Sequence, residues 1–187
     1  MQAEVIHVVG RGALHLRAAG PDDVPLIREL AGRSWHAFYP GMISMPQIYY
    51  MLRQMYSPRK LLADMQEGAG YFIATWRNLP SPDNRQPTAE NIGFLGYDPP
   101  QAGQPLMLQR LYLVPAFQGR GLGAAILTWL ESNARFLGHQ EIRLRVNKHN
   151  HRALKAYRRA GYRPIDALIE PIGEGHVMDD YVLQRQL

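Results

Sequence analysis

A glycine-rich stretch in the second half of the chain has the residue types and the spacing to bind a phosphate. Residues 118–124 read Gln-Gly-Arg-Gly-Leu-Gly-Ala and lie between an apolar run and an amphipathic run. Glycine lets the backbone come close to a ligand and adopt positive φ, so that consecutive N–H groups can converge on one anion. A helix that begins here would add the unpaired N–H groups and partial positive charge of its first turn. Arg120 would add a full positive charge.

The loop departs from two common phosphate-binding patterns. A P-loop requires GxxxxGK followed by Ser or Thr, and this stretch has no such lysine. The dinucleotide fingerprint GxGxxG does not fit Gly-Arg-Gly-Leu-Gly-Ala, and it normally follows an early strand of the chain. Three glycines alone would also suit a tight strand-to-helix connection. The flanking sequence therefore has to decide between a plain turn and a ligand site.

Two flanking segments resemble the GNAT acetyltransferase superfamily. The sequence LYLVPAFQGRGLGAAIL at 111–127 contains that family's pyrophosphate-binding pattern, Gln/Arg-x-x-Gly-x-Gly/Ala, as Gln118, Gly121 and Gly123. The sequence VNKHNHRALKAYRRAGYRP at 146–164 is similar to the family's next motif, which is matched by Asn147, Asn150, Ala153, Tyr157, Gly161 and Tyr162. Two motifs at the proper separation make the resemblance specific, and the order of elements extends it over nearly the whole chain.

The resemblance implies acetyl-CoA as the cofactor and transfer of its acetyl group to an amine. The amides of the glycine loop would bind the pyrophosphate, and the preceding strand would pair with the pantetheine arm like an added β-strand. Strands of the family splay apart here, and Asn147 would hydrogen-bond the arm. The implied cofactor contacts are Leu111, Tyr112, Leu113, Gln118, Gly119, Arg120, Gly121, Leu122, Gly123, Ala124, Asn147, Asn150 and Tyr157. Four basic residues would either screen the adenosine phosphates or form a solvated helix face: Arg152, Lys155, Arg158 and Arg159.

The chemistry also requires an acid and a base. A thiolate leaves more readily when a positioned acid donates a proton to it, and Tyr157 stands where the family has its general acid. An alkylammonium has a pKa near ~10.4 and must lose a proton before it can attack. Many relatives use a glutamate on the strand before the glycine loop, but this strand reads Leu-Gln-Arg at 108–110. The candidate bases are Glu90, Asp98, His149 and Asp180, and ordered water alone is the alternative.

The distribution of charge suggests a cationic acceptor. Net charge is +5, but residues 1–163 carry +9 and residues 164–187 carry −4. In the implied fold the acceptor lies between the first helices and the last strands. The candidate acceptor contacts there are Trp35, Tyr39, Asp179 and Asp180, within an acidic cluster that also contains Glu170 and Glu174. Aromatic faces and carboxylates attract cations, so we expect a small polycationic amine such as spermidine.

The spacing of apolar residues and the positions of glycine, proline and capping residues predict the elements that position these side chains. We expect strands at 13–19, 70–76, 91–98, 106–114, 141–147, 162–168 and 176–187. We expect a helix that begins near residue 21 with Asp22 or Asp23 as its cap, and further helices at 44–57, 57–68, 122–138 and 150–161. Residues 77–89 contain three prolines and predict a flexible hairpin loop.

These elements predict a mixed α/β fold. The resemblance implies a GNAT-like central sheet, mixed but mostly antiparallel, of about six to seven strands flanked by about four to five helices. We expect a single N-acetyltransferase domain over residues 1–187, with its core at 13–187 and an N-terminal extension at 1–12.

Several classes of protein are excluded or disfavoured. The chain contains no cysteine, which excludes disulfides, thiolate nucleophiles and Cys-ligated zinc. The histidines have no evident further metal ligand, so no metal is expected. The basic residues are scattered, which disfavours nucleic acid as a partner. No apolar run reaches membrane-spanning length, and without a signal peptide we expect a cytoplasmic protein.

Two questions stay open at this point. A non-catalytic sensor or interaction module that binds acetyl-CoA or CoA would keep the glycine loop, but it would not need Tyr157 or an open acceptor cleft. A homodimer is compatible with the resemblance, although no residue identifies an interface.

Overall fold

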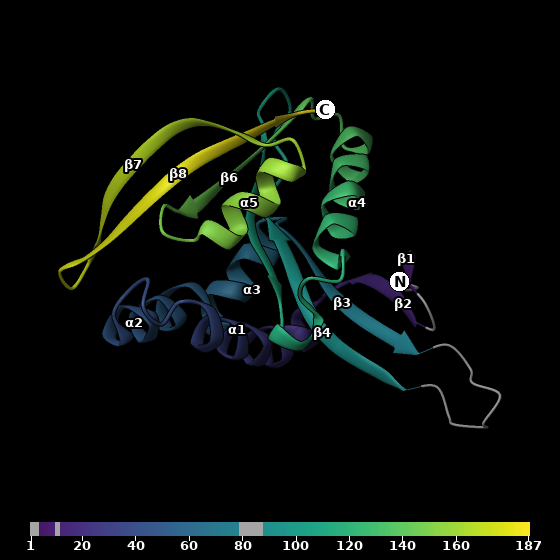
Figure 1. Ribbon diagram of the computed structural model, residues 1–187, viewed down its shortest axis with the longest axis horizontal. Coiled ribbons are helices and arrows are strands. Elements are labelled where there is room, and N and C mark those ends of the chain that lie inside the picture. The colour runs from purple at the N-terminus through teal and green to yellow at the C-terminus, as the bar shows by residue number, and fades with distance from the viewer. Residues whose placement is uncertain (1–3, 10–11, 79–87) are drawn as a thin grey trace.

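A single sheet of eight strands runs through the described part of the molecule (Figure 1). The computed structural model describes residues 4–9, 12–78 and 88–187. The strands lie in the order β1-β2-β3-β4-β5-β6-β8-β7. Their bounds are β1 (Glu4–Val9), β2 (Gly12–Ala18), β3 (Gly70–Asn78), β4 (Ala89–Tyr97), β5 (Leu106–Leu113), β6 (Glu141–Asn147), β7 (Arg163–Gly173) and β8 (His176–Gln186). Every neighbouring pair is antiparallel except β5 and β6, which are parallel.

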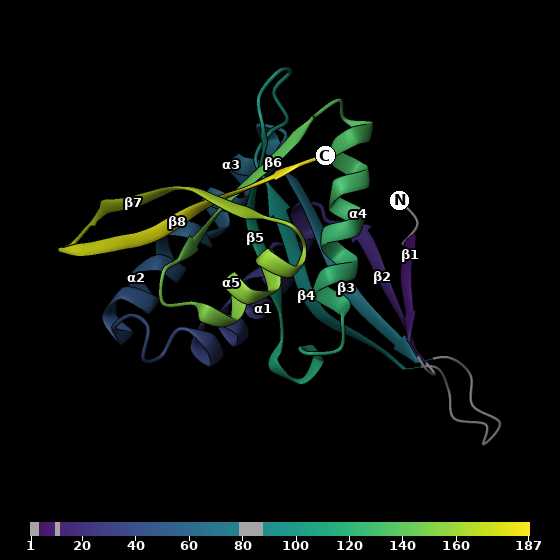
Figure 2. The ribbon, with the colours of Figure 1, turned by 45° about the horizontal axis from the view of Figure 1, so that its top comes forward.

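Within the described ranges, five α-helices flank this sheet. They are α1 (Val24–Phe38), α2 (Met45–Met55), α3 (Pro58–Gln66), α4 (Leu122–Phe136) and α5 (His151–Arg159). Helices α1, α2 and α3 lie on one side of the sheet and α4 on the other, with α5 beside α4 (Figure 2). No helix in the described ranges is both long and apolar enough to cross a membrane.

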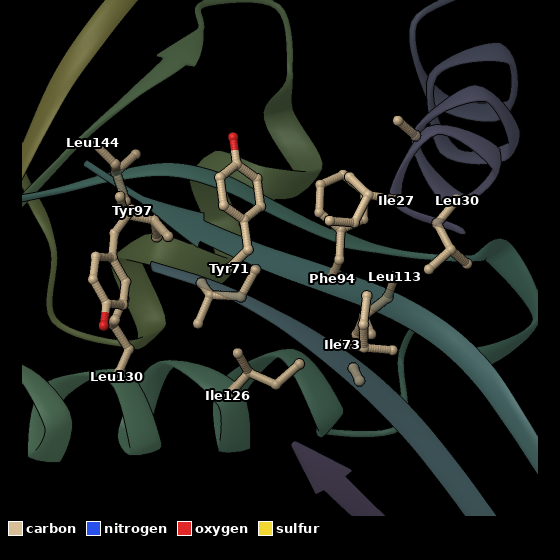
Figure 3. Close-up of a cluster of buried hydrophobic side chains, with 14 of the residues drawn as sticks. Ile27, Leu30, Tyr71, Ile73, Phe94, Tyr97, Leu113, Ile126, Leu130 and Leu144 are labelled. Carbon is tan, nitrogen blue, oxygen red and sulfur yellow. The ribbon is translucent and has the colours of Figure 1, made fainter. Parts of the chain in front are cut away.

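The hydrophobic core fills both sides of the central strands. Ile27 and Leu30 of α1 pack above these strands, and Ile126 and Leu130 of α4 pack below them, all four fully buried (Figure 3). The helical spacing of these apolar residues places them on one face of each helix. The core therefore fixes α1 and α4 on opposite sides of β4 and β5.

The expected mixed α/β class is confirmed, and the sheet is one strand larger than expected. Residues 4–9, which we expected in an N-terminal extension, pair with β2 as the edge strand β1. Most of the expected hairpin loop at 77–89 lies outside the described residues. Strand β7 continues five residues beyond 168, because its pairing with β8 runs on to a two-residue turn at Glu174 and Gly175, where both residues have positive φ.

Two of the expected helix N-caps, Ser44 and Asn150, are present in the structure, and the expected cap at Asp22 or Asp23 is not. Ser44 accepts a hydrogen bond from Gln47 N at the start of α2, and Asn150 accepts one from Ala153 N at the start of α5. Asp23 makes no side-chain cap to α1. Its carboxylate instead binds the Arg17 guanidinium at 2.6 and 2.8 Å, because the short 3-10 turn before α1 places it beside β2.

Strands β5 and β6 open a gap in the sheet that positions the site. Their parallel pairing covers only Leu106–Leu108 against Ile142–Leu144. Strand β5 then bulges, since Gly96 pairs with Arg110 and Tyr97 with Leu108. A bulge bends a strand and increases its twist. The remainder of β5 keeps its partner β4 but leaves β6, so that its other edge faces a cleft.

Candidate functional site

Two adjoining cavities lie along the part of β5 that leaves β6. The glycine-loop cavity has a volume of about 730 Å³ and is lined by the loop before α4, by β5 and by α5. The second cavity has a volume of about 530 Å³ and is lined by α1, α2, β5, β6 and the β7–β8 hairpin. Both cavities are lined by Tyr39, Leu111, Tyr112, Asn150, Ala153 and Tyr157. A ligand in one cavity would therefore meet a ligand in the other at these residues.

The glycine loop has the backbone conformation that its sequence predicts. Gly119 and Gly121 have φ of +75° and +80°, a region that other residues adopt only with strain. A Cβ at either position would meet no heavy atom within 4 Å, so the space beside the backbone is open. Gly121 is the N-cap of α4, and Gly123 and Ala124 line the cavity in the helix's first turn. The N–H groups of this turn thus lie at the cavity wall, where an anion is favoured.

Three side chains of the loop contact other parts of the protein. The Gln118 amide donates to Leu113 O at 2.7 Å and ties the loop to β5. The Arg120 guanidinium lies over the Phe117 ring, 4.9 Å from its centroid, and Leu122 is buried in the core. Neither Arg120 nor Leu122 lines the cavity, because each side chain turns back onto the protein. For these two residues only the backbone remains as an expected contact.

All four basic residues of α5 are exposed, and two of them line the glycine-loop cavity. Arg152 and Arg159 line the glycine-loop cavity, whereas Lys155 and Arg158 do not line it. Thr128, Glu131 and Arg185 also line this cavity. The sequence carried no signal for these three residues. Thr128 and Glu131 belong to the amphipathic pattern of α4, and Arg185 belongs to a closing strand.

The two asparagines of the second motif hold the turn between β6 and α5. Asn147 Oδ1 accepts a hydrogen bond from His149 N at 3.0 Å, and Asn150 Oδ1 caps α5. Asn147 lines the second cavity rather than the glycine-loop cavity, at the end of β6. Asn150 lines both cavities. Their bonds within the turn fix where α5 begins, and with it the position of Tyr157.

Tyrosines separate the two cavities. Tyr157 packs edge-on against Tyr162, with ring centroids 5.6 Å apart, and lines both cavities. Burial raises the pKa of Tyr157 above its usual value, and the nearby Tyr39 raises it further. The phenol is therefore protonated at neutral pH and can donate a proton or a hydrogen bond.

The acidic cluster that the sequence predicted is dispersed by the structure. Asp180 and Glu170 line the second cavity, together with the expected Trp35 and Tyr39. Asp179 does not line it, because successive side chains of a strand point to opposite faces of the sheet and Asp180 faces the cavity. The Asp179 carboxylate pairs with Lys148. Glu174 pairs with Arg53 of α2 at 2.9 Å, at the tip of the hairpin.

The candidate bases are separated in the same way. Glu90 and His149 line neither cavity. Asp98 lines the second cavity and accepts a hydrogen bond of 2.7 Å from the Gln109 amide. Asp180 is 3% exposed, and burial raises its pKa from 3.8 to about 6. Only Asp98 and Asp180, of these four, stand where a bound amine could reach them.

The remaining wall of the second cavity is largely apolar. Its apolar residues include Met51, Met55, Met107 and Met178, with Ile43 and Ile172. The sequence assigned none of these residues to a binding site, because methionines on an amphipathic helix or strand are indistinguishable from core residues. Among the described residues, no group of three or more His, Asp or Glu side chains could hold a metal ion.

Comparisons with known proteins identify the family and support the fold. The model of the acetyltransferase (GNAT) family matches residues 44–162. The chain belongs to this family. Its members use acetyl-CoA as the acetyl donor. Residues of both sequence motifs line the glycine-loop cavity, among them Gln118, Gly121, Gly123, Asn150 and Tyr157. The resemblance of the two sequence motifs is thereby confirmed.

Curated relatives support the family over part of their length. Uncharacterized N-acetyltransferases of Mycobacterium bovis and Mycobacterium tuberculosis are each 32% identical over 80 residues, which is 43% of this chain and 51% of the relative. The match therefore spans about half the length of these relatives.

Solved structures support the fold over nearly the whole chain. The PaiA N-acetyltransferase of Thermoplasma acidophilum, solved in complex with coenzyme A, has a TM-score of 0.71 at 22% identity and covers 93% of this chain and 99% of its own. A GCN5-related N-acetyltransferase of Rhodopseudomonas palustris has a TM-score of 0.69 at 18% identity, with 92% and 94% covered. A chimera of the Vibrio cholerae spermidine N-acetyltransferase SpeG has a TM-score of 0.62 at 18% identity, with 92% and 95% covered.

Proposed function

We propose that this protein is an acetyl-CoA-dependent N-acetyltransferase that acetylates a primary amine on a small cationic acceptor. The observation that carries the proposal is the position of Tyr157 on the wall shared by two cavities. One cavity has the backbone of a phosphate site, and the other has aromatic and acidic walls. A group passed from one ligand to the other would have to pass this phenol.

The residues of the glycine-loop cavity fit acetyl-CoA. The N–H groups of the α4 first turn and of residues 119–121 would bind the pyrophosphate. In the described part of the chain, β5 has no pairing with β6 beyond Leu108, and the amides of the pantetheine arm would pair with that edge. Arg152 and Arg159 lie where they would screen the adenosine phosphates. The thioester supplies an activated acetyl group at the junction of the cavities.

Tyr157 would act as the general acid. Because its pKa is raised, its hydroxyl keeps a proton that it can donate to the departing sulfur. The side chain is held against Tyr162, and the turn hydrogen bonds of Asn147 and Asn150 hold the start of its helix. Such positioning supplies part of the rate acceleration in addition to the proton itself.

The acceptor that we propose is a small amine with one or more ammonium groups, with spermidine as the representative to test. Carboxylates of Asp98, Glu170 and Asp180 line the second cavity, and the rings of Trp35 and Tyr39 offer π faces. The likeness to the SpeG chimera concerns the fold alone, so it adds no weight to this choice.

The alternative is a module that binds CoA without turnover. Such a module would need the glycine-loop cavity but not a second cavity that opens onto Tyr157. Turnover therefore separates the two functions.

Calorimetric titration with acetyl-CoA and with CoA is the first experiment, and we expect both to bind. A thiol-release assay then tests acetylation of polyamines, aminoglycosides, amino acids and peptides. Release of CoA with any amine of the panel supports the transferase. Binding of acetyl-CoA without turnover across the panel would support the non-catalytic module. Activity confined to neutral or acidic acceptors would overturn the cationic acceptor, and turnover of other amines but not of spermidine would overturn the polyamine.

A further inference from the structure

Asp180 is a buried carboxylate on the wall of the second cavity. It lies on β8 directly opposite Asn147 of β6 and opposite Leu168 of β7. The residue is 3% exposed, and its Oδ1 has no hydrogen-bond partner among the described residues. A buried charge without a partner is costly, so such groups are rare unless a ligand or a proton compensates them.

The other carboxylates of this cavity already have partners. The Arg145 guanidinium binds Glu170 at 2.5 Å, and the Gln109 amide donates to Asp98 at 2.7 Å. Arg110, which also lines the cavity, contacts Asp64 at 3.4 Å. Asp180 is therefore the carboxylate of this wall that is left for a cation.

Charged and titratable groups surround Asp180 on several elements. Arg145 of β6 and Lys148 after it favour the ionised carboxylate, whereas Asp179 of β8 and Glu170 of β7 disfavour it. The Tyr39 phenol of α1 is close enough for its own pKa to respond to Asp180. Both cations are already paired, with Glu170 and Asp179 respectively. Burial dominates, and it raises the pKa of Asp180 to about 6.

The cavity that Asp180 lines also has an apolar wall that fits a chain of methylene groups. Met51, Met55, Met107 and Met178 supply flexible, polarizable side chains that adapt to an apolar ligand. Ile43 and Ile172 complete this surface. An ammonium bound by Asp180 would thus be attached to an apolar arm that lies against the methionines.

We propose that Asp180 binds the reactive ammonium of the acceptor and takes the proton that this ammonium must lose, and that the acceptor carries its amine on an arm of methylene groups. The inference rests on the proposed function, because the proton transfer has a purpose only if an acetyl group is transferred. Alkylamines and polyamines both belong to this class.

The proton and electron balance is complete with Asp180 and Tyr157. One ammonium proton moves to the Asp180 carboxylate, and the freed lone pair forms a bond to the carbonyl carbon of the thioester. The C–S bond breaks with its electron pair on sulfur, and the Tyr157 hydroxyl gives that sulfur a proton. The surplus proton on nitrogen restores the phenol, and Asp180 releases its proton to solvent. The products are an amide, a thiol and one proton.

Binding of two matched probes tests the ammonium role without any turnover. Hexylamine and 1-hexanol have the same arm, and only the first carries a charge. At pH 7.5, with and without CoA, we expect the wild-type protein to bind hexylamine at least tenfold more tightly than hexanol. In Asp180→Asn the two affinities should come within about twofold of each other, with hexanol unchanged. Asp166→Asn is the matched control on the same hairpin, where the carboxylate is exposed and lines neither cavity.

The pH dependence of hexylamine binding tests the same group in the unmodified protein. Asp180 becomes neutral as the pH falls through about 6, so hexylamine should bind about tenfold more weakly at pH 5 than at pH 8. Asp180→Asn should show no such change. No histidine lines the second cavity in the described part of the chain. The wild-type series decides the matter even if the variant does not fold.

Turnover tests the proton role. With an amine acetylated by the wild-type protein, kcat/KM of Asp180→Asn should fall about 100-fold or more, the usual contribution of a general base. Calorimetric affinity for CoA should stay unchanged. Equal hexylamine affinity in wild type and variant, or kcat/KM within threefold, would overturn the inference while the transferase stands. Failure of the wild-type protein to bind acetyl-CoA would overturn the proposed function instead.

Discussion

The hydroxyl oxygens of Tyr39 and Tyr112 lie 3.2 Å apart and share a hydrogen bond between α1 and β5. Tyr39 stacks on Trp35 with centroids 4.4 Å apart, and Tyr112 stacks on Phe94 at 5.6 Å. Burial raises the pKa of Tyr39 to about 12 and that of Tyr112 well above its usual value. Both phenols are thus neutral at physiological pH. Together with Tyr157, both tyrosines line both cavities at their junction.

Replacing Tyr157 by Phe should remove turnover and leave cofactor binding intact. The substitution deletes only the hydroxyl that would protonate the leaving sulfur, so kcat should fall about 100-fold or more. The affinity for CoA, measured by calorimetry, should change less than twofold. Tyr49→Phe is the matched control, because Tyr49 is 56% exposed on α2 and lines neither cavity. A Tyr157→Phe protein that kept a third of its activity would exclude the acid role.

Gly121→Ala should reduce the free energy of CoA binding by more than it reduces the free energy of unfolding. At φ of +80° an alanine costs about 1 kcal/mol in backbone strain. Its methyl would also project into the open space beside the loop, where we expect the affinity for CoA to fall at least about tenfold.

Gly103→Ala is the control for strain at this backbone angle. Gly103 has φ of +74° with open space around it, and it lines neither cavity. Denaturant titrations should show similar losses of stability for both variants, and calorimetry should show a loss of CoA affinity for Gly121→Ala alone. Equal CoA affinities in the two variants would remove the glycine loop from the cofactor site.

Gly93→Ala should destabilise the protein by about 3 kcal/mol or more, since overpacking against backbone leaves little room for relaxation. A Cβ at this position would lie 2.1 Å from Tyr112 O and 2.8 Å from Leu113 Cδ2. Gly32→Ala, in the middle of α1 with no heavy atom within 4 Å, should instead stabilise by about 0.5–1 kcal/mol. Chemical denaturation of the two variants measures both changes. A fully stable Gly93→Ala protein would contradict the close approach of β4 and β5.

Asp180→Asn should change how stability depends on pH. The folded-state pKa of Asp180 is about 6, above its ordinary value of 3.8. A raised carboxyl pKa contributes stability below pH 3.8, and this contribution is lost as the pH rises through about 6. The uncharged amide avoids that loss. The stability of Asp180→Asn relative to wild type should therefore rise by up to about 3 kcal/mol between pH 3.5 and pH 8.

Urea titrations at pH 4, 6 and 8 measure this difference. Asp166→Asn serves again as the control, since its exposed carboxylate has no such burial. A constant difference between Asp180→Asn and wild type across this pH range would mean that Asp180 titrates normally. A gain in stability together with a loss of activity is the expected signature of a buried charge kept for function.

The sequence by itself determined the parts of this protein that depend on neighbours in the chain. Ser44 and Asn150 cap helices because each side chain bonds a backbone N–H three residues on. The glycine loop is readable because positive φ at Gly119 and Gly121 is a property of single residues. The fold class followed from the alternation of helical and strand patterns, and two short motifs identified the family. Strand β1 and the full length of β7 were missed because each depends on pairing with another strand.

Only the tertiary structure decided which side chains share a cavity. Asp179 and Asp180 are neighbours with the same side chain, and strand alternation turns one toward the cavity and the other toward Lys148. Which of the two faces inward depends on the register of β8 against β6, where a slip of one residue would exchange them. The Met-rich wall and the contact between Tyr39 and Tyr112 likewise join residues that are distant in the chain. Local pattern carries no information on such pairs, because packing of the whole sheet against its helices brings them together.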